Sequence, residues 1–147
     1  MVAQCVLFAL IAAGPATWRG WPPWPFPGGQ PAGIAGVAMI VAGLALAIWG
    51  GVKHGAALQA LPYPREDATV IHTGPYRIVR HPIYGGALSA AFGWALWRQG
   101  WLTLIYAALL FLLFDAKARR EEEWLVEKFP SYAEYRRRVR KLVPFVY

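Results

Sequence analysis

The sequence predicts an all-α integral membrane protein with about four transmembrane helices, a cytosolic connecting loop and C-terminal cytosolic helices. Of its 147 residues, 57% are hydrophobic and only 16% are charged, whereas typical soluble domains carry about 25% charged residues. Uncharged apolar runs close to membrane-spanning length recur along the chain. The basic residues gather in the segments that follow these runs. This length predicts a single domain, residues 1–147.

The first apolar run, Val2–Ala13, is short for a membrane span, which needs about 20 residues. An extension of the helix to Trp18 would make it long enough. A secretory signal peptide is the alternative, but no Lys or Arg precedes Arg19, so its basic N-terminal region is missing. The Trp- and Pro-rich stretch 18–31 is predicted to be an interfacial connector, because proline excludes a regular helix and tryptophan favours the headgroup layer.

The second span is predicted at Gly33–Val52, which contains no charged residue. Gly43, Ala47 and Gly51 recur every four residues and would form a face for a closely packed neighbouring helix. The basic segment 53–80 has no long apolar run. Within it, Ala68–Ile71 is rich in residues that favour extended structure.

Pro82–Trp97 is predicted to be a third, short span, with a face of small residues at Gly85, Ser89 and Gly93. A tight polar turn at 98–100 leads into Trp101–Phe114, which begins the fourth span. Because the connection is so short, we expect the third and fourth helices to form an antiparallel hairpin.

The fourth helix is predicted to continue out of the membrane, since Asp115–Lys128 contains strong helix formers and no Gly or Pro. Three pairs of opposite charges four residues apart support it: Asp115/Arg119, Lys117/Glu121 and Arg119/Glu123. Ser131 and Glu134 have the spacing of a capping box. They would begin a last helix that carries Arg136, Arg137, Arg138, Arg140 and Lys141.

The distribution of charge predicts the topology. With four spans, the loop 53–80 and the segment after Phe114 lie on one side and hold 13 of the 15 Lys and Arg residues, while Arg19 and Arg98 lie on the other. The positive-inside rule then places both termini and both basic segments in the cytosol, and we expect a prokaryotic inner membrane. Nucleic-acid binding would not require several apolar runs of this length.

This topology brings two polar segments, His72–Gly86 and Asp115–Glu123, to one side of the membrane. Ionisable groups near hydrocarbon are costly, so such a cluster is a candidate functional site. Non-functional interpretations remain open. The His81 ring could cap a helix start, Arg80 could reach lipid phosphate, and the acidic run could be a solvated helix face. The basic helix at 136–141 could lie on anionic lipid, and Tyr76 and Tyr84 could be interfacial aromatics.

Several classes of site have no support in the sequence. A single cysteine, Cys5, excludes an internal disulfide, and no His or Cys spacing indicates a metal site. No glycine-rich dinucleotide motif and no Ser or Cys nucleophile motif is visible.

The residues of the candidate site resemble a known family. The motifs are Gly74-Pro75-Tyr76-x-x-x-Arg80-His81-Pro82-x-Tyr84-x-Gly86, Lys117-x-x-x-Glu121-Glu122-x-x-Leu125, Tyr132-x-x-Tyr135 and Pro144-Phe145. Together they resemble the isoprenylcysteine carboxyl methyltransferases, and phospholipid N-methyltransferases share much of the pattern. The resemblance covers about residues 68–147.

The resemblance implies a methyltransferase that uses S-adenosylmethionine and a lipid-like or isoprenylated acceptor. Its implied cofactor-binding residues are Ala68, Thr69, Val70, Ile71, Tyr76, His81, Pro82, Ile83, Tyr84 and Glu121, with Gly74, Arg80 and Glu122 in supporting roles. Lys117 takes the place of a substrate-binding arginine, and lysine lacks the planar fork that grips a carboxylate bidentately. No catalytic acid or base and no metal is implied, because methyl transfer to an anionic acceptor needs mainly positioning and desolvation.

Two other functions remain open. An NADPH-dependent membrane reductase related to steroid reductases would have a similar layout. A non-catalytic membrane scaffold would keep the helices without the chemistry.

Overall fold

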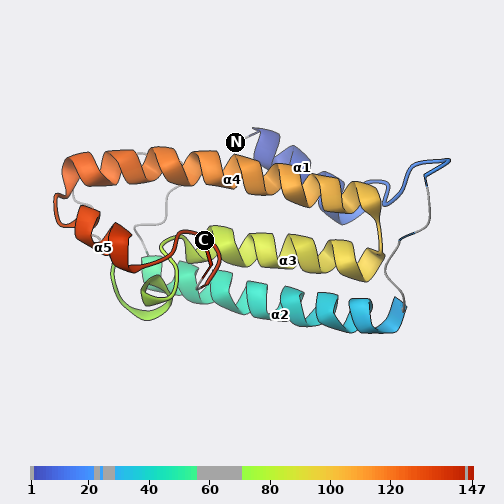
Figure 1. Cartoon of the computed structure of the whole chain (residues 1–147), viewed down its shortest axis with the longest axis horizontal. Coiled ribbons are helices and arrows are strands. Elements are labelled where there is room, and N and C mark those ends of the chain that lie inside the picture. Colours follow the sequence, from blue (N-terminus) through green and yellow to red (C-terminus); the bar gives the residue numbers. More distant parts are fainter. Residues whose placement is uncertain (1, 22–23, 25–28, 56–70, 145) are drawn as a thin grey trace. The chain divides into compact units, whose positions relative to one another are not determined.

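The structure is a computed structural model that describes residues 2–21, 24, 29–55, 71–144 and 146–147. These residues form helices and no strand, which confirms the all-α class (Figure 1). In chain order the elements are α1 (Val2–Ala13), α2 (Gly29–His54), the short 3₁₀ helix η2 (Gly74–Arg77), α3 (Pro82–Arg98), α4 (Trp101–Lys128) and α5 (Tyr132–Arg138). The chain divides into two compact units: a first unit of residues 1–44 and 86–113, and a second unit of residues 45–85 and 114–147.

Two helices in the described part of the chain are long and apolar enough to cross a membrane. They are α2 from Gln30 to His54, with 25 residues, and α4 from Trp101 to Lys128, with 28 residues. Helix α3 has 17 residues and α1 has 12. Two of the four predicted spans thus correspond to helices of sufficient length, and the other two correspond to the shorter helices α1 and α3.

The expected extension of α1 to Trp18 is wrong, because the helix ends at Ala13. The Gly14 N–H still bonds to the Leu10 carbonyl at 2.9 Å. Pro15 has no N–H to continue the series and disfavours a helical conformation in the residue before it. Twelve residues reach about 18 Å, which is less than the hydrocarbon thickness of about 30 Å.

Helix α2 exposes a row of large aliphatic side chains. Ile34, Val41, Ile48 and Val52 have exposed fractions between 62% and 72%. An apolar surface of this kind is unfavourable in water and is typical of a face that contacts membrane.

In the first unit, glycines bring α2 and α3 into backbone contact. A Cβ atom on Gly36 would lie 2.5 Å from the Gly93 carbonyl oxygen, and one on Gly43 would lie 2.4 Å from the Gly86 carbonyl oxygen. The predicted small-residue face is therefore confirmed at Gly43 and Gly93. The glycines in contact are seven residues apart on each helix rather than four, because seven residues make about two turns and bring the same face back to the neighbouring helix.

The predicted turn between α3 and α4 is confirmed. It consists of Gln99 and Gly100, and Gln99 adopts a positive φ of 50°. The Arg98 side chain donates to the Gly14 carbonyl at 3.1 Å, and the Leu102 N–H donates to the Ala16 carbonyl at 2.9 Å. The segment after α1 is thereby held against the α3–α4 hairpin within the first unit.

In the second unit, α4 continues without a break to Lys128, as predicted, but the capping box at α5 does not form. Ser131 has helical dihedral angles, φ −65° and ψ −20°, and its side chain makes no capping hydrogen bond. Glu134 instead pairs with Arg138 one turn later. The helix ends at Arg138, so Arg140 and Lys141 lie beyond it and not on it as predicted.

Candidate functional site

The turn before α3 is built on a glycine and a proline. Gly74 begins η2 with φ +63°, a conformation that a residue with a Cβ atom rarely adopts. Pro75 follows and is buried, and its carbonyl accepts the N–H groups of Ile78 and Val79 at 3.0 and 3.1 Å. The turn predicted at Gly74-Pro75 is thus present, and it delivers Tyr76 to the interior of the second unit.

Helix α3 begins at Pro82, as predicted, and the residues just before it are held by a distant segment. The N–H groups of Arg80 and His81 donate to the carbonyls of Arg140 and Lys141 at 2.8 and 3.1 Å. The His81 side chain is not a cap, since its Nε2 atom lies 3.0 Å from Glu122 Oε1. Together these contacts fix the direction in which the His81 ring enters the site.

Glu122 is the fully buried centre of a cluster of basic groups. Its Oε1 atom lies 2.7 Å from Arg80 Nε and 3.0 Å from His81 Nε2. Its Oε2 atom lies 3.2 Å from Arg80 Nη2 and 3.2 Å from Arg136 Nε. A buried carboxylate is tolerated only when it is paired and hydrogen-bonded. The solvated-face interpretation is therefore wrong for Glu122, although it suits Glu123, whose side chain is 58% exposed.

Arg80 does not reach out to lipid phosphate. Its side chain is only 8% exposed. Besides Glu122, it donates from Nη1 to the carbonyl of Arg136 at 2.9 Å and to the carbonyl of Val139. The guanidinium thus joins α4 to the chain at and beyond α5.

A polar contact between α3 and α4 joins Tyr84 to Glu121. The Tyr84 hydroxyl donates to Glu121 Oε2 at 3.2 Å. The Tyr84 ring stacks on His81, with centroids 5.5 Å apart, and on Phe114, with centroids 4.7 Å apart. The Lys117 ammonium lies 5.2 Å from the centroid of the Tyr84 ring. We call this group the aromatic stack: His81, Tyr84 and Phe114, with Lys117 beside it.

A further hydrogen-bonded group surrounds Tyr76. Its hydroxyl lies 2.8 Å from His54 Nδ1 at the end of α2, and the Tyr135 hydroxyl donates to its carbonyl at 2.5 Å. Burial and, to a smaller extent, the negative charge of Glu121 raise the pKa of Tyr76 to about 12. Burial also raises the pKa of Tyr132 and of Tyr135 above the ordinary tyrosine value. These phenols therefore stay protonated at neutral pH.

The structure brings most of the predicted site residues together in the second unit. The contacts above link Arg80, His81, Tyr84, Lys117, Glu121 and Glu122 to one another. Tyr76 lies in the same unit and contacts His54 and Tyr135. Pro82 and Ile83 pack against Gly50 of α2. Ile71 is half-buried outside any helix, and Ala68, Thr69 and Val70 lie outside the described residues.

Sequence reasoning missed several members of this region. The sequence pattern assigns His54 no role of its own within the basic segment 53–80, and it marks Phe114 only as the end of an apolar run. Their one signal was position, because both lie where an apolar run gives way to polar residues. Among the described residues, no group of three or more His, Cys, Asp or Glu side chains could hold a metal ion.

One family model and two yeast proteins that match this chain are methyltransferases by name. Residues 32–132 match the family model of phospholipid methyltransferases. The chain is 34% identical over 87 residues to the protein-S-isoprenylcysteine O-methyltransferase of Schizosaccharomyces pombe. It is 35% identical over 83 residues to the protein of the same name from Saccharomyces cerevisiae. Each match covers 55% of this chain and 35% of the yeast protein.

A bacterial relative matches over a stretch of similar length. The chain is 33% identical over 81 residues to the cobalt-zinc-cadmium resistance protein CzcN of Cupriavidus metallidurans, covering 54% of this chain and 38% of that protein. The matched stretch thus spans little more than a third of the length of the curated relatives.

Proposed function

The chain belongs to the phospholipid methyltransferase family, and on this premise we propose that it transfers a methyl group from S-adenosylmethionine to a lipid-like or isoprenylated acceptor. The hydrogen bond between Tyr84 and Glu121, beside the aromatic stack, is the observation that carries the proposal. It joins two of the four sequence motifs on which the family resemblance rests. The family match favours this reaction over reduction by NADPH.

Glu121 is suited to hold the cofactor. When bound, S-adenosylmethionine supplies a methyl group activated on a sulfonium, and it carries an ammonium group that a carboxylate can bind. The Glu121 side chain is 26% exposed, so it can accept a further hydrogen bond while Tyr84 holds Oε2. Tyr84 is itself fixed by its stacked neighbours, and it therefore orients the carboxylate before a ligand arrives.

Glu122 supports this arrangement from below the surface. It ties His81 to Arg80 and Arg136, and His81 in turn stacks on Tyr84 at an interplanar angle of 6°. A preorganised site of this kind lowers the barrier by holding groups in place rather than by exchanging protons. No catalytic acid or base is needed if the acceptor is anionic.

Lys117 is the proposed contact for the acceptor. Its ammonium lies beside Tyr84 and 5.9 Å from the centroid of the Phe114 ring, which puts a positive charge next to an apolar surface. A lipid-like acceptor has this combination of an anionic head and an apolar tail. Lysine acts as a point charge without the fork of arginine, so we expect it to bind a phosphate or a carboxylate without strong preference.

The proposal is tested by binding and by methyl transfer with the purified full chain in detergent. Calorimetry should show binding of S-adenosylmethionine and of S-adenosylhomocysteine but not of NADPH. Transfer of a labelled methyl group into a total membrane lipid extract should then identify the acceptor.

Matched variants make the binding test specific. Glu121→Gln should weaken cofactor binding, whereas Glu123→Gln, on the exposed side of the same helix turn, should leave it unchanged. Absence of cofactor binding at millimolar concentration would end the proposal. Binding without turnover on any lipid fraction would support the scaffold instead.

A further inference from the structure

We propose that Asp115 and Lys141 are positioning residues that set the distance across the aromatic stack, an inference that rests on the proposed function. Neither residue belongs to the predicted cofactor or acceptor contacts. The argument comes from a second buried polar cluster, which lies next to the Glu122 cluster and shares no side chain with it.

The cluster is centred on the carboxylate of Asp115 in α4. Lys141 Nζ donates to Oδ1 at 2.5 Å, and the Tyr147 hydroxyl donates to the same oxygen at 2.9 Å. Arg119 Nε donates to Oδ2 at 2.7 Å. The Lys141 side chain is only 10% exposed and that of Asp115 is 13% exposed. Lys141 and Tyr147 thus hold the segment after α5 against α4 by their side chains.

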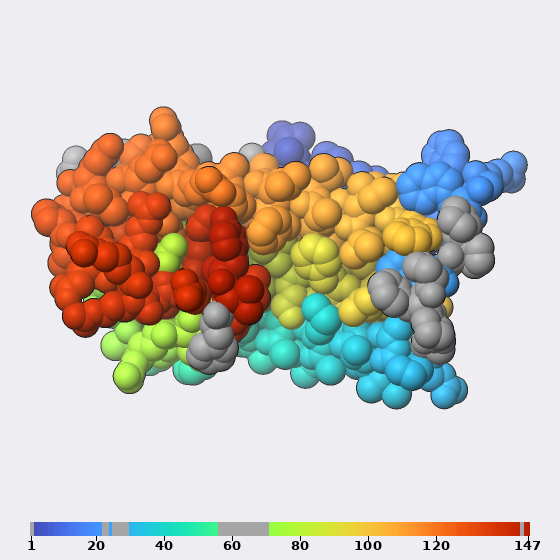
Figure 2. Space-filling view, viewed as in Figure 1, coloured from blue at the N-terminus to red at the C-terminus, as the bar shows by residue number. Residues whose placement is uncertain are grey.

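The same segment is held against the start of α3 by its backbone. The carbonyl of Lys141 accepts the N–H of His81, and Val79 pairs with Arg140 in an isolated parallel bridge. One turn further along α3, a Cβ atom on Gly85 would lie 2.3 Å from the carbonyl oxygen of Leu142. In Figure 2 the dark red atoms of this segment lie against the orange and red surface of α4 and α5.

These contacts connect both outer members of the aromatic stack through one ion pair. Phe114 is the chain neighbour of Asp115, and His81 is bonded through its N–H to the carbonyl of Lys141. Tyr84 stacks on both rings. The separation between His81 and Phe114, and with it the direction of the Tyr84 hydroxyl, therefore depends on the Asp115–Lys141 pair.

The burial of this pair favours a positioning role over a purely stabilising one. Removing two charges from water costs several kcal/mol per ion, and replacing a buried pair with apolar residues is often neutral or stabilising. A pair in such a place contributes its geometry, because its hydrogen bonds have one direction and one length.

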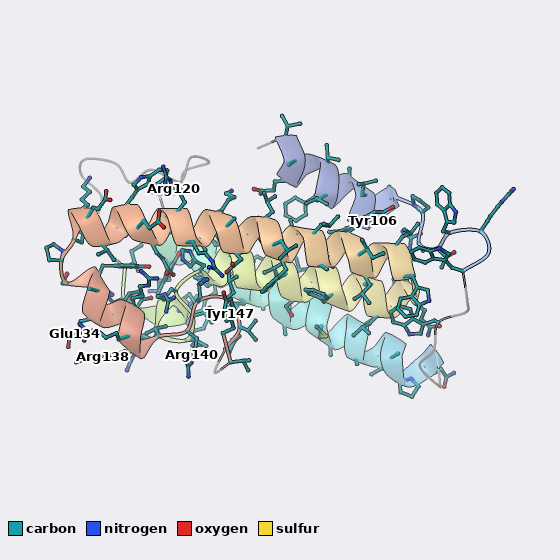
Figure 3. The ribbon with its side chains drawn as sticks, turned by 45° about the horizontal axis from the view of Figure 1, so that its top comes forward. Tyr106, Arg120, Glu134, Arg138, Arg140 and Tyr147 are labelled. Atoms are coloured by element: carbon teal, nitrogen blue, oxygen red, sulfur yellow. The ribbon has the colours of Figure 1, made fainter. Side chains whose placement is uncertain are left out.

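The test uses the full chain in detergent and four variants. Asp115→Leu combined with Lys141→Met removes both charges and fills their space with apolar side chains. Lys141→Met alone breaks the pair, and Lys141→Arg conserves the charge. The matched control is Arg138→Met, which breaks the exposed pair with Glu134 on α5 (Figure 3).

Three quantities are measured for each variant: the thermal midpoint, the Kd for S-adenosylhomocysteine, and the ring resonances of His81 in ¹⁵N-histidine NMR spectra, assigned with His81→Gln. We expect the double variant to keep a thermal midpoint close to that of the unchanged chain. Its Kd should nevertheless rise about tenfold, equivalent to about 1.4 kcal/mol, and its His81 resonances should move. In Lys141→Arg, the Kd and the His81 resonances should lie closer to those of the unchanged chain than they do in Lys141→Met. Arg138→Met should change neither the Kd nor the His81 resonances.

A double variant with unchanged Kd and unchanged His81 resonances would overturn the inference and leave the pair a structural contact only. If the unchanged chain binds no cofactor, the proposed function fails, and the His81 resonances alone then decide the positioning role. Movement of those resonances supports it, and their constancy refutes it.

Discussion

The hydroxyl of Tyr84 donates a hydrogen bond to Glu121 at 3.2 Å, although 37 positions separate the two residues along the chain. This contact is the meeting point of α3 and the polar part of α4. It is also where the two polar segments predicted to share one side of the membrane come together. The hydrogen bond gives the Glu121 carboxylate a defined direction.

The first prediction concerns Tyr84. Tyr84→Phe keeps the ring stacked between His81 and Phe114 but removes the donor to Glu121. The freed carboxylate loses its orientation, so we expect cofactor affinity to fall about 5- to 10-fold, equivalent to about 1–1.4 kcal/mol, which lies within the usual net contribution of one hydrogen bond. Calorimetry measures this, and Tyr106→Phe in the first unit is the control. Equal affinities for both variants would contradict the role of the hydroxyl.

The second prediction concerns Glu122. Glu122→Gln leaves Arg80, His81 and Arg136 without their carboxylate. Breaking a buried charged pair by removing one partner typically costs about 3–5 kcal/mol. We expect a large fall in the denaturation midpoint in detergent. Glu123→Gln should change stability by less than about 0.5 kcal/mol, as exposed substitutions do, and a similar loss in both variants would refute the central position of Glu122.

The third prediction concerns Gly85. Gly85→Ala places a Cβ atom 2.3 Å from the Leu142 carbonyl oxygen, and a backbone atom cannot swing away as a side chain can. The segment must shift, at a cost of about 1–3 kcal/mol for an overpacked contact. Gly33→Ala is the control, because its nearest neighbour would be a Trp97 side-chain atom at 3.9 Å. Thermal denaturation that gives the same midpoint for both variants would disprove the close contact.

The fourth prediction concerns alkaline pH. The pKa of Tyr76 is raised to about 12 by burial, whereas an unfolded tyrosine titrates near 10. Between these values the unfolded chain loses the proton first, so the contribution of Tyr76 to stability is complete below pH 10 and declines as pH rises toward 12. Denaturation measured across this range should show a shallower decline in Tyr76→Phe. Part of the decline should remain in this variant, because the pKa values of Tyr132 and Tyr135 are also raised.

The fifth prediction concerns orientation in the membrane. In a Cys5→Ser background, a cysteine at Gln99 should react with a membrane-impermeant maleimide added to intact cells, and a cysteine at Ser131 should react only after lysis. Ser131 is exposed and makes no side-chain capping bond, so the substitution should not disturb α5. The reverse labelling pattern would invert the topology predicted from the positive charges.

Several parts of the fold follow from local physical chemistry. Proline and glycine mark the C-terminal end of α1, the start of η2 and the start of α3, because their effects on the backbone do not depend on distant residues. The continuous α4 follows from a run of helix formers without a breaker. The sequence therefore determined that the chain is helical, where its apolar segments lie, and which two polar segments are candidates for a site.

The tertiary structure decided which members of those segments matter. Successive residues on a helix point about 100° apart, so the run Glu121-Glu122-Glu123 alone does not reveal that its middle member is buried among three basic groups while the next is exposed. In the sequence Lys141 is one of several neighbouring basic residues, and only the fold pairs it with Asp115 on α4. Such pairings join residues far apart in the chain, and their energy depends on burial and direction, which the folded arrangement alone supplies.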